Sequence, residues 1–128
     1  MSLDADGFMK SFQAFWSAPT PDTWQSIFTP QITLLIPPAV EPLTYEQLPG
    51  YMAELLKMIP DLTLEAHRWA PVQDGLLVEW TLTGTTAAGV PLKIDGVDRV
   101  ILDGDQSSES VAYLDPAPLL AALGATTG

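Results

Sequence analysis

Residues 92–102 read LKIDGVDRVIL, and this alternation of apolar and polar side chains predicts a β-strand. Successive side chains on a strand point to opposite faces of its sheet. The apolar residues on one of these faces are Leu92, Ile94, Val100 and Leu102. Asp98 lies on the same face, where an unpaired charge would be costly. We therefore expect Asp98 either to face a cavity or to be held by buried hydrogen bonds.

Similar stretches on both sides of this strand complete a predicted sheet. They are bounded by turn residues, which include Asp74-Gly75 and Asp103-Gly104. The predicted strands are Leu62–Ala70, Leu76–Thr86 and Ser107–Leu114. A shorter apolar run, Ile32–Ile36, comes earlier in the chain and is stopped by Pro37-Pro38.

The first half of the chain is predicted to be mainly helical. An aromatic stripe at helical spacing consists of Phe8, Phe12, Phe15 and Trp16. We expect Asp4 to cap this helix and Pro19 to end it. Thr20-Pro21 predicts a second, short helix that runs through Phe28.

Two further helices are indicated by their capping residues. Thr44-x-x-Gln47 matches a capping box and predicts a helix that extends to about Met58. Pro49 must either kink this helix or mark its true first turn. Asp115 is expected to cap a last helix, Ala117–Leu123, which Gly124 closes.

This order of elements predicts the fold class. Helices followed by consecutive strands joined by hairpins are typical of an α+β domain, and the length suits a single domain over residues 1–128. We expect a cone in which a curved antiparallel sheet wraps around about three N-terminal helices. An apolar pocket would lie inside the cone.

The composition excludes several functions. A net charge of −11 argues against nucleic acid and against anionic membranes as partners. Without cysteine there is no thiol nucleophile and no zinc–thiolate site, and the lone His67 cannot form a histidine-rich metal site. We expect no metal and no cofactor. Neither a signal peptide nor a membrane-spanning run is recognisable, so we expect a cytoplasmic protein.

Several motifs occur together in a characteristic order. They are Ile59-Pro60-Asp61-Leu62, Trp80-Thr81-Leu82-Thr83-Gly84-Thr85, Asp98 followed by Asp103-Gly104, and Tyr113-Leu114-Asp115 followed by Leu119-Leu120 and Leu123-Gly124. From about Phe8 to Gly124 the chain thereby resembles the SnoaL-like branch of the nuclear-transport-factor-2-like superfamily. The resemblance implies a helix-lined cone, an apolar ligand cavity and frequent dimerisation through the open face of the sheet. It implies no single activity, because the superfamily includes polyketide cyclases, ketosteroid isomerases, epoxide hydrolases, dehydratases and non-catalytic binding proteins.

The catalytic groups of these relatives are mostly missing. Ketosteroid isomerases use a carboxylate base, a tyrosine and a protonated aspartic acid. By resemblance Asp98 takes the place of the acid, but Ile36 stands at the position of the base and Phe12 at that of the tyrosine. The Arg-x-Asp of the epoxide hydrolases is absent from Val78-Glu79-Trp80-Thr81, and the aspartate of the polyketide cyclases is absent from Ser110-Val111-Ala112.

Asp98 remains as the candidate catalytic residue. It is either a neutral acid that donates to a ligand carbonyl, or a structural aspartate held by hydrogen bonds. Burial should raise its pKa above the usual value of about 3.9. With Asp98 as the polar anchor, the predicted lining of the ligand pocket is Phe12, Phe15, Trp16, Ile36, Tyr51, Trp80, Val100 and Ala112.

Two functions stay open at this stage. The first is a SnoaL-like protein that binds a small apolar molecule, with isomerisation or cyclisation of a carbonyl-containing ring compound as the least strained reaction. The second is a non-enzymatic dimeric binding or scaffold module with a degenerate active site, which Ile36 and Phe12 favour.

The other polar candidates are predicted to lie on the surface. His67 shares a face with Thr63, Glu65 and Trp69 by strand alternation, so it is either a base coupled to Glu65 or, in the simpler interpretation, a surface or dimer-face residue. Glu79 is expected to point outward. Apolar residues on the outward face of the sheet predict a homodimer, and they are Val97, Ile101, Val111 and Tyr113.

Overall fold

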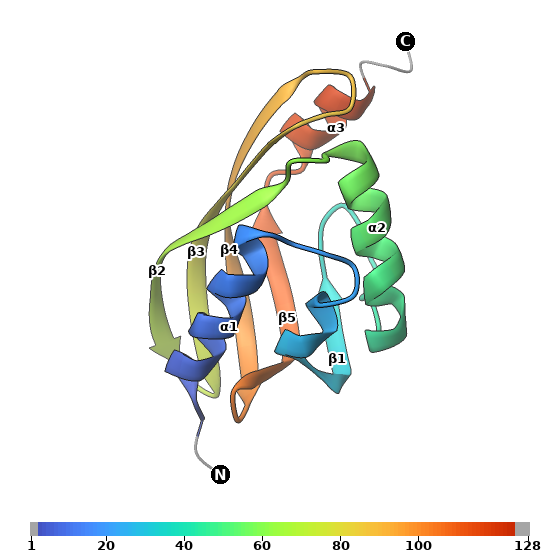
Figure 1. Ribbon diagram of the computed structural model, residues 1–128. Helices are drawn as coiled ribbons and strands as arrows, with labels where there is room; N and C mark the ends of the chain where they lie inside the picture. Colours follow the sequence, from blue (N-terminus) through green and yellow to red (C-terminus); the bar gives the residue numbers. More distant parts are fainter. Residues whose placement is uncertain (1–2, 125–128) are drawn as a thin grey trace.

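The computed structural model describes residues 3–124, and Figure 1 shows their arrangement. In chain order the elements are α1 (Ala5–Ser17), the short 3₁₀ helix η1 (Trp24–Ile27), β1 (Phe28–Leu35), the 3₁₀ turn η2 (Tyr45–Gln47), α2 (Leu48–Met58), β2 (Thr63–Val72), β3 (Gly75–Thr85), β4 (Pro91–Asp103), β5 (Gln106–Leu114) and α3 (Ala117–Gly124).

The strands form one five-stranded sheet in the order β1-β5-β4-β3-β2. The pairs from β2 to β5 are antiparallel, whereas β1 runs parallel to β5. The predicted α+β cone is confirmed, but the sheet is mixed rather than wholly antiparallel. The reason is that β1 and β5 lie far apart in the sequence, so no hairpin dictates their relative direction.

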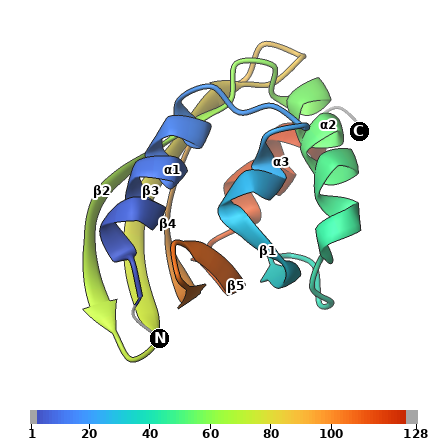
Figure 2. The same cartoon turned by 60° about the horizontal axis from the view of Figure 1, so that its bottom comes forward.

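The sheet is curved, and helices cover its concave side (Figures 1 and 2). Figure 2 shows α1 lying over the β2–β4 side, with η1 and α2 towards β1. The concave face and these helices share one apolar core, whose fully buried members include Phe8, Trp24, Met52 and Val78.

The helix caps behave as the sequence predicts. The Asp4 side chain accepts a hydrogen bond of 2.8 Å from the backbone N–H of Gly7 at the start of α1. The capping box is formed, because the Thr44 N–H donates to Gln47 Oε1 at 2.9 Å and the Thr44 side chain caps in return. Pro49 falls in the first turn of α2, so it marks the start of the helix and does not kink it.

The predicted helix from Thr20 through Phe28 is wrong. Only the single turn η1 forms, and the first strand begins at Phe28 rather than Ile32. The pairing of β1 with β5 is interrupted between Phe28 and Thr33, the interval that contains Pro30. Proline has no N–H to donate to a neighbouring strand, so the sequence around Pro30 does not predict a strand. The strand forms there because of its tertiary pairing.

A bulge in β2 changes the side-chain parity after His67. The register passes from Ala66 opposite Trp80 to Arg68 opposite Glu79, which leaves His67 without a paired residue. Trp69 then lies opposite Val78, on the other face from His67. The predicted shared face of these two residues is therefore wrong, because strict alternation holds only in the absence of a bulge.

Within residues 3–124, every helix is too short or too polar to span a lipid bilayer.

Candidate functional site

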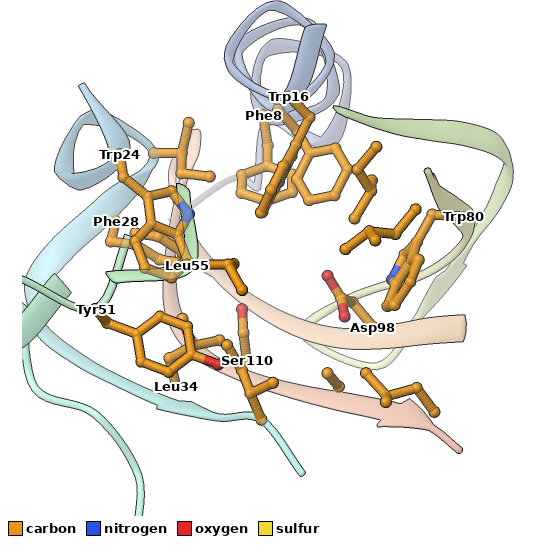
Figure 3. A pocket seen from close by; sticks show the side chains of 17 residues that line it. Phe8, Trp16, Trp24, Phe28, Leu34, Tyr51, Leu55, Trp80, Asp98 and Ser110 are labelled. Carbon is orange, nitrogen blue, oxygen red and sulfur yellow. The ribbon is translucent and has the colours of Figure 1, made fainter. Parts of the chain in front are cut away.

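A pocket lies between the helices and the concave face of the sheet (Figure 3), and its volume is about 80 Å³. Aromatic and aliphatic side chains from most elements of the fold form its walls. The lining residues are Phe8, Phe12, Trp16, Trp24, Ile27, Phe28, Leu34, Ile36, Tyr51, Leu55, Leu64, Trp80, Leu82, Asp98, Ser110, Ala112 and Leu114.

Most of the predicted lining residues meet in this pocket. They are Phe12, Trp16, Ile36, Tyr51, Trp80, Asp98 and Ala112. Phe15 and Val100 are buried but do not line it. Phe15 instead stacks on Trp24 with ring centroids 6.2 Å apart, and Val100 is 1% exposed in the core.

Some of the lining residues missing from the prediction come from segments with weaker patterns. Trp24 and Phe28 fall within the predicted helix from Thr20 through Phe28, of which only the turn η1 forms, and Ser110 is polar. Phe8 belongs to the same aromatic stripe as Phe12, so its spacing indicates a core-facing position. Leu55 occupies the inner side of α2, where its i, i+4 relation to Tyr51 is the available signal.

One wall is a cluster of aromatic rings. Trp16 and Trp24 meet edge to face with centroids 6.1 Å apart, and Trp24 stacks against Tyr51 at 6.0 Å. Phe8 and Phe12 continue the cluster along α1 at 5.7 Å. Such contacts between rings add to the stability that their burial alone provides.

Asp98 is the acidic residue of the pocket, and strand alternation places it there as predicted. It lies opposite Val78 on β3 and Ala112 on β5, on the concave face. Its side chain keeps some accessible surface, and this surface opens into the apolar cavity (Figure 3) rather than onto the outside of the protein. No hydrogen bond with good geometry reaches the carboxyl group from the rest of residues 3–124, so the cavity-facing interpretation holds.

Burial raises the pKa of the Asp98 carboxyl from 3.8 to about 7, because apolar surroundings disfavour the charged form. The indole N–H of Trp80 opposes this shift and lowers the pKa in part. That contact is weak, since Trp80 Nε1 has no partner that meets hydrogen-bond geometry within the described chain. Asp98 therefore keeps its proton to a much higher pH than an exposed aspartate does.

Gly96 determines where the Trp80 ring lies. The two residues are directly opposite each other on β4 and β3, and a Cβ on Gly96 would overlap the indole ring. The absence of a side chain lets the indole lie flat on β4, two residues from Asp98. Trp80 is thereby held against the carboxyl group.

The cationic neighbour of Asp98 points away from the pocket. Arg99 lies on the convex face, where its Nη1 is 3.3 Å from Glu109 Oε2. This agrees with the expectation that adjacent strand residues cannot pair across a sheet. The Asp98 carboxyl consequently has no charge partner from its own strand.

The histidine predicted as a surface residue is exposed on the convex face. His67 Nε2 is 2.7 Å from Thr81 Oγ1, which donates to Asp95 Oδ1 at 2.6 Å, and His67 Nδ1 is 3.6 Å from Glu65 Oε1. Glu79 also points outward and accepts from Arg68 Nε at 3.0 Å. The sheet separates both residues from the pocket. No group of three potential metal ligands gathers within residues 3–124.

Solved structures with low sequence identity share this fold. A protein of ketosteroid isomerase-like fold from Catenulispora acidiphila, in complex with trimethylamine, is 18% identical with a TM-score of 0.81, covering 91% of this chain and 92% of that one. A candidate polyketide cyclase from Bacillus cereus is 20% identical with a TM-score of 0.76, covering 91% and 78%. TerC co-crystallised with polyporic acid is 12% identical with a TM-score of 0.78, covering 92% and 98%.

The sequence comparisons agree with the structural ones. No curated protein matches the chain. The family model of the SnoaL-like domain matches residues 9–109, which include the helices and strands that build most of the pocket. The chain therefore belongs to the SnoaL-like domain family.

Proposed function

We propose that the protein binds a small carbonyl compound in this pocket, with the protonated Asp98 donating a hydrogen bond to the carbonyl oxygen. The observation that carries the proposal is the Asp98 carboxyl group on the wall of a cavity lined mainly by aromatic and aliphatic side chains, where burial raises its pKa to about 7. A neutral carboxylic acid is a strong donor toward a carbonyl, and the ring cluster supplies apolar contact for the rest of the ligand.

The same group supports acid–base chemistry. A pKa near the working pH lets one residue give up a proton and take one back, which isomerisation or cyclisation of a carbonyl compound requires. The rest of the ketosteroid isomerase apparatus is missing, because Ile36 and Phe12 line the pocket without a base or a hydroxyl group. Asp98 is the acidic group that remains for catalysis in this pocket.

The size of the cavity limits the ligand. A volume of about 80 Å³ is well below the ~300–1,000 Å³ of ordinary ligand pockets. A ligand of a few heavy atoms fits, whereas a larger ring system requires side chains such as Leu55 and Tyr51 to move aside. The trimethylamine and polyporic acid in two structures of this fold support a ligand-binding role over a range of ligand sizes.

Binding of cyclopentanone should weaken as the pH rises. If only the protonated Asp98 binds the ketone, the apparent affinity should fall roughly 30-fold between about pH 5.5 and about pH 8.5, with a midpoint near pH 7. Titration of ¹⁵N-labelled protein, followed at the Trp80 indole resonance, measures the affinity. Asp98→Asn should abolish the pH dependence, whereas Asp105→Asn in an exposed turn should preserve it. Equal affinity at both pH values in the unmodified protein would refute the role of Asp98.

A non-enzymatic binding or scaffold module is the second candidate. The small cavity and the apolar side chains at Ile36 and Phe12 favour it. Under this alternative the pocket binds ketones without chemical change, or stays closed to them. Prolonged incubation of the protein with a bound ketone in D₂O distinguishes the two, because acid–base catalysis exchanges the protons next to the carbonyl.

We also propose that the convex face of the sheet is a homodimer interface. The register places Val97, Ile101, Val111 and Tyr113 on this face, where Tyr113 is 54% exposed. Leu77 joins them from β3 and is 39% exposed. Exposed apolar side chains that lie together on a sheet face are typical of an interface.

A charge in the middle of this face should separate the dimer. Val97→Glu introduces a carboxylate opposite Glu79 and Tyr113, and the sedimentation or light-scattering mass at micromolar concentration should fall from dimer to monomer. Val40→Glu is the matched control, because Val40 is 91% exposed in a loop. A monomeric mass for the unmodified protein would argue against the interface.

A further inference from the structure

Two serines on β5 form a buried pair whose hydroxyl groups are hydrogen-bonded to each other. Ser107 Oγ and Ser110 Oγ are 2.7 Å apart, and Ser107 Oγ also lies 3.1 Å from the backbone carbonyl oxygen of Glu109. A carbonyl oxygen only accepts, so the two hydrogen bonds exist together when Ser107 donates to the Glu109 carbonyl. In that arrangement Ser110 is the donor of the pair and Ser107 is the acceptor. Ser110 therefore offers the pocket lone pairs and no proton.

The second polar group is the indole of Trp24. Its side chain is 2% exposed, and its Nε1 has no hydrogen-bond partner within the described residues. An N–H group that is buried without an acceptor is costly to the protein. Figure 3 shows the Trp24 nitrogen and the Ser110 hydroxyl both turned into the cavity. An acceptor in the cavity would remove the cost.

Ser110 and Trp24 differ in the hydrogen-bonding group that each can bind in the cavity. Ser110 can accept a further hydrogen bond and the Trp24 N–H lacks an acceptor, and a hydroxyl group both donates and accepts. A ketone oxygen only accepts, and an ammonium group only donates. We propose that Ser110 and Trp24 form a hydroxyl-binding subsite, so that the ligand of this pocket carries a hydroxyl group in addition to its carbonyl.

The sheet register places this subsite within reach of Asp98. Asp98 pairs with Ala112 and Val100 pairs with Ser110, so Asp98 and Ser110 are diagonal neighbours on the concave face. Diagonal neighbours in an antiparallel pair have Cα atoms roughly 7–8 Å apart. One short hydroxy ketone can therefore contact both. The carbonyl end of this assignment rests on the proposed function above, whereas the hydroxyl end rests on Ser107, Ser110 and Trp24 alone.

Three small probes test the two ends separately. They are cyclopentanone, cyclopentanol and 3-hydroxycyclopentanone, titrated at about pH 5.5 and followed by the tryptophan indole resonances. The unmodified protein should bind cyclopentanol, and it should bind the hydroxy ketone about five- to tenfold more tightly than cyclopentanone. Ser110→Ala and Trp24→Phe should each remove most of that gain.

Two further variants sharpen the result. Ser107→Ala frees the proton of Ser110 to turn into the pocket, so cyclopentanone should gain affinity and the preference for a hydroxyl group should shrink. Thr29→Val removes another buried hydroxyl, which has no hydrogen-bond partner among residues 3–124 and does not line the pocket, and it should leave all three affinities unchanged.

The outcomes distinguish this subsite from the role of Asp98. Ketone binding that depends on Asp98, together with a hydroxyl gain that Ser110→Ala leaves intact, overturns the subsite and spares the proposed function. Cyclopentanol binding that depends on Ser110 and Trp24, with ketone binding indifferent to Asp98→Asn, supports the subsite and overturns the carbonyl assignment. A hydroxyl group that brings no gain has only replaced a bound water, which overturns the subsite. Failure of all three probes to bind overturns both.

Discussion

Asp98→Asn should stabilise the protein at about pH 8 by roughly 2 to 4 kcal/mol. The folded-state pKa of this acid is raised from 3.8 to about 7, so the native state binds the proton more tightly than the unfolded chain does. Each pKa unit corresponds to ~1.4 kcal/mol, which sets the upper end of the range. The penalty begins as the pH rises past about 4 and levels off above about 7. Asparagine has a similar shape and never carries this charge.

Urea unfolding of both proteins across this pH range measures the effect. The stability difference should be small near pH 4 and should grow until about pH 7, because only the unmodified protein carries the titrating carboxyl. Asp105→Asn, at an exposed position, should stay within about 0.5 kcal/mol of the unmodified protein. A destabilised Asp98→Asn variant at pH 8 would instead mean that Asp98 is a charged, well-bonded structural residue, and the pocket would lose its acid.

Gly75→Ala should cost about 3 kcal/mol or more, or prevent folding. Gly75 begins β3 opposite Ile101, and a Cβ at this position would overlap the carbonyl oxygen and carbon of Val100. These are backbone atoms of β4, so they cannot move aside without disrupting the β3–β4 ladder. Overpacking against side chains costs ~1–3 kcal/mol, and a clash with backbone should be at the upper end or beyond.

Gly50→Ala provides the matched control for this substitution. Gly50 lies in α2, and a Cβ there would meet nothing within 4 Å. Alanine in a helix is favoured over glycine by up to about 1 kcal/mol, so this variant should be slightly more stable. Urea unfolding of the two variants compares them directly. A Gly75→Ala protein within 1 kcal/mol of the unmodified protein would show that the hairpin tolerates a wider separation of β3 and β4 than the structure indicates.

Features that depend on near neighbours in the chain could be predicted from the sequence. The aromatic stripe of α1 and the caps at Asp4 and Thr44 follow from helical spacing and from hydrogen bonds over three residues. The position of Asp98 on the concave face follows from alternation along β4, which has no bulge between Leu92 and Ile101. The direction of its pKa shift follows in turn from the apolar residues that share its face.

Features that depend on distant parts of the chain required the tertiary structure. Pairing with β5 moved the start of the strand back from Ile32 to Phe28, against the local helix signal at Thr20-Pro21, and aligned the strand parallel to β5. The bulge at His67 arises from the pairing of β2 with β3, and no residue in the sequence around it predicts it.

The proposed hydroxyl-binding subsite at Ser110 and Trp24 also required the tertiary structure. The roles of Trp24 and Ser110 depend on which groups lie beside them after folding. For Ser110 they depend also on the direction of its hydrogen bond with Ser107. The sequence by itself thus determined the fold class and the acid in the pocket, because both follow from short-range periodicity. The tertiary structure alone decided which other polar groups surround that acid, because hydrogen bonding and desolvation depend on contacts between segments far apart in the chain.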